Sequence, residues 1–310
     1  MGDIRNKLAK IERNKRERAA MNRFLGLPDD HVRNPTPEPP PIRCSCGLTW
    51  SETKLWAVQP DRWRPTVYGC LNCLPDWAAY EVENNERQDC MCNLYSLTKS
   101  QQAIRDLVKA MRDLTGNLPA MPAIFPNRMA PVVRTAPDGV RELVMMRWGF
   151  PPPNIPGSKP RNPYLTNVRN TDSRYWQTYL KKPEQRCLVP VTSFAEPDNN
   201  QGPKSIWTWF AQDDTRPLMF FPGIWREWEG DRGTKAVPDI GKHMVFSFLT
   251  TDASQDVAPI HSDATPVCLL DEDARETWMN APWELAQGLQ KPPPPGALKI
   301  VAAGRKEDGG

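Results

Sequence analysis

The sequence predicts an α+β fold, in which a mixed or antiparallel β-rich sheet curls into a barrel-like core with a few flanking helices. Segments rich in β-branched and aromatic residues recur through the second half of the chain, and helix-like segments between them are few. This succession argues against a doubly wound parallel sheet, in which strands and helices alternate. The 34 prolines of the 310-residue chain agree, because proline breaks helix interiors.

The expected strands are short and bounded by turn-forming residues. They span residues 143–148, 187–194, 206–210, 218–225, 244–250, 266–270 and 298–302. Three segments show helical spacing of apolar residues, namely 100–114, 273–279 and 283–289.

The chain divides into five predicted parts. A charged, basic helix is expected in residues 1–33, followed by a proline-rich linker over 34–43. A small module with a second linker is expected over 44–90, the main domain over 91–303 and a flexible tail over 304–310. The clearest change in composition lies near residue 91, where an acidic, polar segment gives way to the β-rich region.

Four of the eight cysteines form two close pairs, Cys44 with Cys46 and Cys70 with Cys73. Four thiolates suit tetrahedral zinc, and metal binding can fold a module too small to fold alone. The alternative is a chance cluster, since the first pair is CxC rather than the commoner CxxC. A zinc ion here would be structural, and no cofactor is expected for catalysis.

The net charge of +3 permits a nucleic-acid partner without requiring one. No apolar run is long enough to span a bilayer, and the N-terminus lacks a signal-peptide core. We therefore expect a cytoplasmic chain with no membrane partner.

Cys92 follows Met91 where the main domain begins. If Met91 were a start residue and were removed, Cys92 would carry a free α-amine and a thiol on one carbon frame. Such a 1,2-aminothiol forms a Schiff base with an aldehyde and closes to a thiazolidine. Both groups have pKa values within about two units of neutrality, so modest shifts activate them. The alternative is an inert cysteine in a cysteine-rich linker.

Three further segments carry candidate groups. Asn167 and Arg169 share one face if TNVRNT is a strand, which places an amide beside a phosphate-binding guanidinium. Glu196 ends an apolar strand, where partial burial would suit its carboxyl to proton transfer. His261 lies in a loop before an apolar strand. Taken singly, each is also compatible with an ordinary surface residue.

Taken in order, Met-Cys, TNVRNT, RCLVPVTSFAEP, GIWREW, FLTTDAS and PIHSDATPV resemble the SRAP family, the SOS response-associated peptidases or abasic site processing proteins. The resemblance covers roughly residues 91–303. It implies an enzyme, of peptidase or lyase type, that couples covalently to abasic sites in single-stranded DNA through a thiazolidine, with a peptidase activity that exposes Cys92. It also implies a nucleoid-associated, monomeric protein of the DNA damage response.

The resemblance implies a role for each matching residue. Cys92 forms the thiazolidine, Asn167 hydrogen-bonds the linkage, Glu196 moves protons and His261 assists opening of the sugar ring. Arg169 contacts the DNA backbone.

One departure from the family pattern concerns DNA contacts. The family often has an arginine where this chain has Leu94, and Arg128, Arg147, Arg161 and Arg174 are candidates to compensate. Trp148 and Trp176 are candidate stacking residues for a kinked strand.

The larger departure is the extension before Cys92, whose amine is in a peptide bond in the chain as written. Either translation starts at Met91, or the extension is a propeptide that is released, or the fusion is genuine and catalytically silent. We favour the first two. Two other functions stay open: a cysteine peptidase acting on proteins in trans, and a zinc-dependent adaptor that binds nucleic acid or protein.

Overall fold

The computed structural model of the chain describes residues 56–58, 67–69, 92–153, 164–198, 206–234 and 236–308. The predicted N-terminal helix, the proline-rich linker and the four cysteines of the expected zinc module lie outside the described residues. Before residue 92 there are two short strands, β1 (Trp56–Val58) and β2 (Val67–Gly69), which pair antiparallel.

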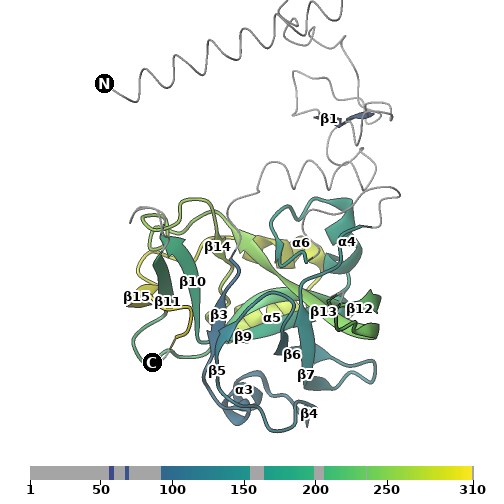
Figure 1. Ribbon diagram of the computed structural model, residues 1–310, viewed down its shortest axis with the longest axis horizontal. Helices are drawn as coiled ribbons and strands as arrows, with labels where there is room; N and C mark the ends of the chain where they lie inside the picture. The colour runs from purple at the N-terminus through teal and green to yellow at the C-terminus, as the bar shows by residue number, and fades with distance from the viewer. Residues whose placement is uncertain are drawn as a thin grey trace, which may run out of the picture. The chain divides into compact units, whose positions relative to one another are not determined.

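Five strands of the main domain close into a mixed barrel (Figure 1). Neighbours pair antiparallel from β7 through β6, β9 and β12 to β13, and a parallel pairing of β13 with β7 completes the ring. The strands are β6 (Met129–Thr135), β7 (Arg141–Trp148), β9 (Arg186–Val191), β12 (Met219–Asp231) and β13 (Ile240–Thr251). This architecture confirms the predicted barrel-like, mixed fold class.

Three short strands extend this sheet. They are β4 (Arg112–Asp113), which pairs parallel with β7, β8 (Asn167–Val168), which pairs parallel with β13, and β14 (Thr265–Pro266), which pairs antiparallel with β13.

A second, antiparallel sheet has the strand order β15-β11-β10-β3-β5. Its strands are β3 (Tyr95–Leu97), β5 (Met121–Ile124), β10 (Ser193–Asp198), β11 (Ile206–Ala211) and β15 (Lys299–Ala303). β3 and β10 lie side by side in the register Tyr95 with Phe194 and Ser96 with Ser193. This pairing brings the start of the domain next to the middle of the chain.

Helices are few in the described part of the main domain, as predicted. They are α3 (Gln101–Val108), α4 (Arg174–Leu180), α5 (Glu272–Asn280) and α6 (Trp283–Ala286), with 3-10 turns at Pro183–Gln185 and Gln287–Leu289. Ser100 caps α3 by accepting a hydrogen bond from the backbone N–H of Ala103, and Asp271 caps α5 in the same way.

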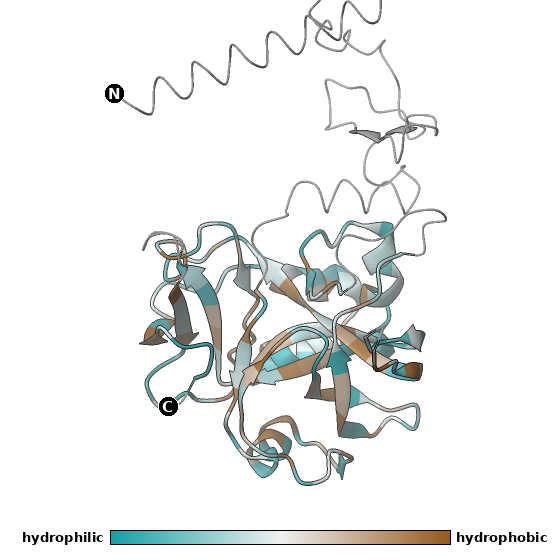
Figure 2. Ribbon diagram, viewed as in Figure 1, coloured by the Kyte–Doolittle hydropathy of each residue, from teal (hydrophilic) through white to brown (hydrophobic). Residues whose placement is uncertain are grey.

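Aromatic rings fill the space inside the barrel. Trp148 stacks on Phe248 with ring centroids 5.2 Å apart, and Tyr95 meets Trp148 edge to face at 5.0 Å. The barrel strands accordingly carry brown, apolar stretches in Figure 2, whereas connecting loops are largely teal. Tyr95 comes from β3, so this packing fixes the second sheet against the barrel within three residues of Cys92.

Three predicted elements differ from the structure. The helix expected over 100–114 ends at Val108, because Lys109 adopts a left-handed φ of 53° and the chain turns into β4. The apolar residues that extended the helical pattern, Met111 and Leu114, are exposed. The strand expected over 187–194 is two strands, β9 and β10, which belong to different sheets.

The segment expected as a strand over residues 266–270 is regular only at its first residue, since β14 spans Thr265–Pro266. Conversely, β6 was not predicted. Its sequence, MAPVVRT, contains a proline and lacks alternating polarity, because four consecutive residues are buried, which requires apolar side chains on both faces of the strand.

Candidate active site

Cys92 and Glu196 form the centre of the site. The thiol of Cys92, 1% exposed, donates a hydrogen bond to Oε1 of Glu196, which is 0% exposed. The antiparallel register of β3 and β10 explains the contact, since continuing it beyond Tyr95 and Phe194 sets Glu196 opposite the residue after Cys92. The two groups are 104 residues apart in sequence, and only the second sheet brings them together.

Burial governs the protonation of both groups. It raises the pKa of Glu196 to about 8, and the hydrogen bond from Cys92 opposes this rise. The pKa of the Cys92 thiol lies well above its usual range, first because of burial and then because of the negative charge of Glu196. At neutral pH the pair therefore favours a protonated thiol beside a protonated carboxyl group that can release its proton a little above neutrality.

His261 lies at the second oxygen of Glu196, in the loop between β13 and β14. Its Nδ1 is 3.8 Å from Glu196 Oε2 and 3.3 Å from the carbonyl oxygen of Ala264. A carbonyl oxygen only accepts, so a hydrogen on Nδ1 completes that contact and leaves the lone pair on Nε2. Among the described residues, neither Nε2 nor Glu196 Oε2 has a hydrogen-bond partner. An imidazole and a carboxyl group thus face each other with spare hydrogen-bonding capacity.

Asn167 holds the backbone of Cys92. Its Nδ2 donates to the Cys92 carbonyl oxygen at 3.2 Å and to Thr166 Oγ1 at 3.0 Å, and Thr166 Oγ1 donates in turn to Asn93 Oδ1 at 3.1 Å. β8 supplies Asn167 through its parallel pairing with β13, opposite Phe248. Oδ1 of Asn167 is buried and has no partner within the described ranges. The amide therefore fixes one end of the site and keeps one acceptor free.

The structure thus brings four predicted residues together: Cys92, Asn167, Glu196 and His261. A family model described as SOS response associated peptidase (SRAP) matches residues 91–305, which is more than half of the chain. The chain belongs to the SRAP family. The match begins one residue before Cys92 and encloses the whole site.

Solved structures agree with this SRAP fold. A protein from Bordetella bronchiseptica is 22% identical, with a TM-score of 0.52, over 69% of this chain and 98% of that one. A protein from Bacteroides thetaiotaomicron is 18% identical, with a TM-score of 0.51, over 68% of this chain and 90% of that one. At these identities the likeness concerns the fold alone. The comparison with curated proteins finds no match.

Arg169 follows β8 in this SRAP domain, and its guanidinium pairs with the carboxylate of Asp252. β8 contains only Asn167 and Val168, so the strand on which Asn167 and Arg169 were expected to share a face ends before Arg169. The side chain of Asp252 is 85% exposed. A phosphate that binds Arg169 would therefore replace or join an ion pair at the surface, where such pairs contribute little stability.

The two tryptophans expected to stack on DNA bases lie inside the domain. Trp148 is 0% exposed and donates from Nε1 to the carbonyl oxygen of Thr166, and Trp176 is 4% exposed and packs on Phe150 and Tyr175. We correct that expectation: neither ring offers an exposed face to a base, because the barrel core and α4 use both faces. Trp148 instead supports the strand that carries Asn167.

Leu94, at the position where SRAP proteins often have arginine, is 1% exposed and packs with Ala195 and Trp209. An apolar side chain suits this buried cluster, and it makes no charged contact. The Leu94 side chain therefore contributes to packing between the segment that leads into β3 and strand β10.

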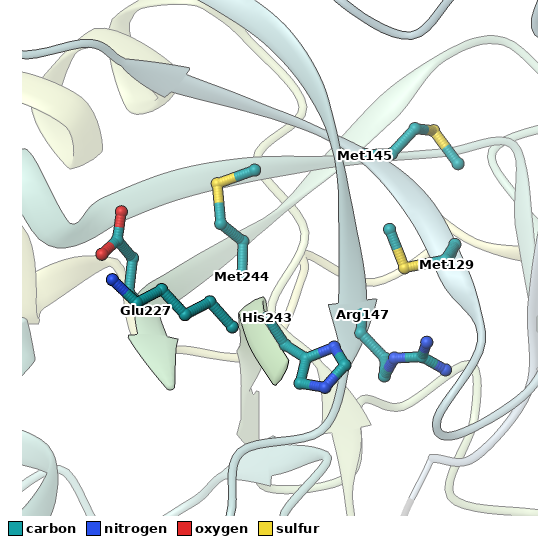
Figure 3. A pocket seen from close by; sticks show the side chains of 7 residues that line it. Met129, Met145, Arg147, Glu227, His243 and Met244 are labelled. Carbon is teal, nitrogen blue, oxygen red and sulfur yellow. The ribbon is translucent and has the colours of Figure 1, made fainter. Parts of the chain in front are cut away.

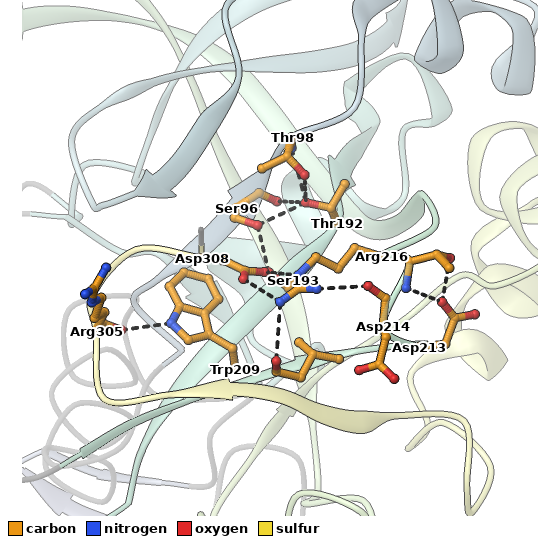
Figure 4. Close-up of polar contacts among 12 residues, drawn as sticks. Ser96, Thr98, Thr192, Ser193, Trp209, Asp213, Asp214, Arg216, Arg305 and Asp308 are labelled. Atoms are coloured by element: carbon orange, nitrogen blue, oxygen red, sulfur yellow. Dashed lines mark hydrogen bonds and ion pairs between the residues drawn. The ribbon is translucent and has the colours of Figure 1, made fainter. Parts of the chain in front are cut away.

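The sequence did not reveal the polar clamp beneath β10 (Figure 4). Asp308 is 1% exposed and accepts hydrogen bonds from Ser193 Oγ at 2.5 Å and from Arg216 at 2.7 and 2.9 Å. Ser96 Oγ on β3 lies 2.7 Å from Ser193 Oγ. Asp308 falls in the segment expected to be a flexible tail, and no sequence pattern distinguishes it from the acidic residues around it. The clamp ties β3 and β10 together three residues from Glu196.

Among the described residues, no group of three or more His, Cys, Asp or Glu side chains is arranged so that it could hold a metal ion. None of its helices is long and apolar enough to cross a membrane. Two pockets outside the Cys92 site lie around Arg147. Three methionines, together with Arg147 and His243, line one of them, of about 610 Å³ (Figure 3).

Proposed function

We propose that this SRAP domain forms a covalent thiazolidine with the aldehyde of an abasic site in single-stranded DNA, through a form of the chain that begins at Cys92. The observation that supports this most directly is the buried contact between the Cys92 thiol and Glu196, with His261 at the second carboxyl oxygen. The site thus places a nucleophile beside a carboxyl group whose pKa burial raises to about 8, with an imidazole next to that carboxyl group.

The reaction needs a balanced set of proton transfers. The α-amine of Cys92 adds to the aldehyde carbon, and the resulting carbinolamine loses one water to give an imine. The protonated carboxyl of Glu196 donates to the departing hydroxyl, and its carboxylate then takes the thiol proton as Sγ adds to the imine carbon. The carbinolamine nitrogen keeps its hydrogen, so the imine forms as a protonated iminium ion and becomes the neutral ring N–H when the sulfur adds. Glu196 ends protonated, as it began, and the net change is one water released. A pKa of about 8 suits Glu196 to both roles.

His261 suits the step that supplies the aldehyde. The abasic sugar is mostly a closed ring, and its opening moves one proton from the anomeric hydroxyl to the ring oxygen. Nε2 of His261 is buried without a partner among the described residues and can accept that proton. Asn167 positions the Cys92 carbonyl and leaves Oδ1 to accept a hydrogen bond from the linkage.

The chain as written carries Met91 before Cys92, so its amine is an amide and cannot form the imine. We propose that hydrolysis of the Met91–Cys92 bond, or synthesis from Met91 followed by methionine removal, exposes the amine. Peptidase chemistry confined to this bond would account for the peptidase description of the family.

A cysteine peptidase acting in trans fits the geometry less well. Such enzymes use a thiolate stabilised by a neighbouring imidazolium. Here the Cys92 thiol donates to a carboxyl group, and burial raises its pKa. A 1% exposed thiol also offers little access to a folded protein substrate.

The test uses residues 92–310, produced with a free Cys92 amine, and an oligonucleotide bearing an abasic site. We expect a crosslink that forms without a reductant and resists heating. Cys92→Ser keeps the amine and should give a crosslink only after borohydride reduction of the imine. Cys268→Ala is the matched control and should react like the parent. An equal, reductant-independent crosslink by Cys92→Ser, or by a chain retaining Met91, would overturn the proposal.

A further inference from the structure

A second pocket, of about 740 Å³, lies outside the Cys92 site and carries three arginines. Arg128, Arg147 and Arg232 line it, together with Asn127, Tyr164 and Asp239. Asp239 is the one acidic side chain among its described lining residues, so the lining is positively charged. Nothing in the reaction at Cys92 uses this pocket.

Arg232 is the unusual member of the set. It is 2% exposed, and its guanidinium lies between the rings of Trp228 and Tyr164, at 4.7 and 5.1 Å from their centroids. Nη2 donates to the carbonyl oxygen of Gly149 at 2.6 Å, but Nε and Nη1 have no hydrogen-bond partner among the described residues. Burial lowers its pKa to about 10, so the group is still a cation at neutral pH. A buried cation with two idle donors calls for an anion.

Arg147, which also lines the pocket, has a hydrogen-bond donor without a partner as well. Arg147 donates from Nη2 to Asp239 at 2.6 Å and from Nη1 to the Asn127 carbonyl at 3.0 Å, and its buried Nε has no partner in the described part of the chain. These bonds hold the planar guanidinium in place. A tetrahedral oxyanion with several acceptor oxygens, such as a phosphate, matches two fixed guanidinium groups better than a single carboxylate does.

The pocket is linked to the Cys92 site through β8 and β13. Tyr164, which lines the pocket, precedes Asn167 by three residues, or about 10 Å of extended chain. On β13, Arg147 pairs with Val245 and Asn167 pairs with Phe248, again three residues apart. A single strand of nucleic acid whose reacting nucleotide reaches Cys92 extends over several times this distance.

We propose that the pocket of Arg128, Arg147 and Arg232 binds a backbone phosphate of the single-stranded DNA, near the nucleotide that reacts at Cys92. The proposal rests on the proposed function for the identity of the polymer. Leu94 carries no charge where the family often has an arginine. In this proposal the positive charge that contacts DNA comes instead from the turn before β6 and from the ends of β7 and β12.

The test measures non-covalent binding of a fluorescent oligothymidylate without abasic sites to the full 310-residue chain, by anisotropy from 50 to 200 mM salt. We expect Arg232→Gln and Arg128→Gln each to weaken binding about tenfold at low salt. Each should also reduce the slope of log K against log salt by about 0.7, the value for one phosphate contact on a single strand. The exposed Arg305→Gln is the matched control and should leave both quantities unchanged.

Thermal unfolding of each variant separates ligand binding from folding. Arg232 also holds the Gly149 carbonyl, so Arg232→Gln removes a structural contact as well as a charge, whereas Arg128→Gln leaves that contact intact. Unchanged affinity and slope in Arg128→Gln and in a folded Arg232 variant would overturn the proposal. So would failure of the parent chain to bind the oligonucleotide, or stabilisation by inorganic phosphate with no effect of either variant on DNA binding.

This experiment has no covalent step, so it is independent of the free amine. A charge effect on binding without any crosslink by residues 92–310 would reject the proposed function and keep the phosphate site. A crosslink without any effect of the arginine substitutions on binding would support the proposed function and reject the phosphate site.

Discussion

Two buried carboxyl groups lie next to the same strand, β10, and the structure treats them in opposite ways. Asp308 receives hydrogen bonds from Ser193 and two from Arg216, so both its oxygens are paired. Glu196 receives one from the Cys92 thiol, forms no ion pair with a Lys or Arg of the described ranges, and leaves Oε2 without a hydrogen bond. Asp308 contacts β10 at Ser193, and Glu196 is itself a residue of β10, three positions further along.

The difference separates structure from chemistry. A buried carboxylate with a cation partner stays ionised and holds its neighbours in place. A buried carboxyl group without one becomes neutral and is ready to exchange a proton, which is the state of Glu196 with its pKa of about 8. The four predictions that follow test this contrast, from the largest expected effect to the smallest.

Replacing Glu196 with Gln should slow crosslinking by residues 92–310 at least 100-fold, the usual scale for loss of an acid–base group. The shape and the hydrogen bond to Cys92 are largely kept, so the fold should survive. The measurement is the rate of crosslink formation on denaturing gels, with circular dichroism to check folding. Glu229→Gln, at an exposed position on β12, is the control. A rate within threefold of the parent would show that Glu196, like Asp308, takes no part in proton transfer.

Replacing Asp308 with Ala should lower the free energy of unfolding by about 3 kcal/mol, because Arg216 and Ser193 lose a buried partner. Urea unfolding measures the change, and the exposed neighbour Glu307→Ala should change stability by less than about 0.5 kcal/mol. Where the protein remains folded, the crosslinking rate per folded molecule should be nearly unchanged. A stability equal to the parent's would contradict the clamp.

The stability of the parent should depend on pH through Glu196. Its pKa in the folded state is about 8 and its ordinary value is 4.5, so between these values the folded state holds a proton that the unfolded state has lost. Stability should therefore fall as pH rises through this range, by at most about 1.4 kcal/mol per pH unit. The difference in unfolding free energy between the parent and Glu196→Gln, followed from pH 5 to 8, isolates this contribution. A flat difference would mean that Glu196 is ionised throughout.

Replacing Asn167 with Ala should slow crosslinking about fivefold, the effect of losing one net hydrogen bond of about 1 kcal/mol that fixes the Cys92 carbonyl. Asn280→Ala removes an exposed amide as a control. If Asn167 acts by position alone, the pH dependence of the rate should keep its midpoint. A shifted midpoint would instead indicate that Asn167 tunes the Cys92–Glu196 pair.

The sequence predicted much of the site because its chemistry is local. Met91-Cys92, the amide of Asn167, the carboxyl of Glu196 and the imidazole of His261 each lie in a short, ordered motif, and their order resembles that of the family. The burial of Trp148 and Trp176 could not be predicted from the sequence, because the motif contains the same tryptophan whether its side chain packs in the core or faces solvent. The same holds for Leu94, whose neighbours Ala195 and Trp209 come from β10 and β11.

The sequence by itself determined the composition of the site, the β-rich class of the fold and the resemblance to the family from near residue 91 onward, since these depend on residue type and near neighbours. Only the tertiary structure decided which carboxyl group is paired. Arg216 reaches Asp308 across 92 residues, whereas Glu196 meets a thiol 104 residues away and has no described Lys or Arg paired with it. The physical reason is that desolvation and charge pairing depend on distance in space, which pairing between strands sets and the order of residues does not.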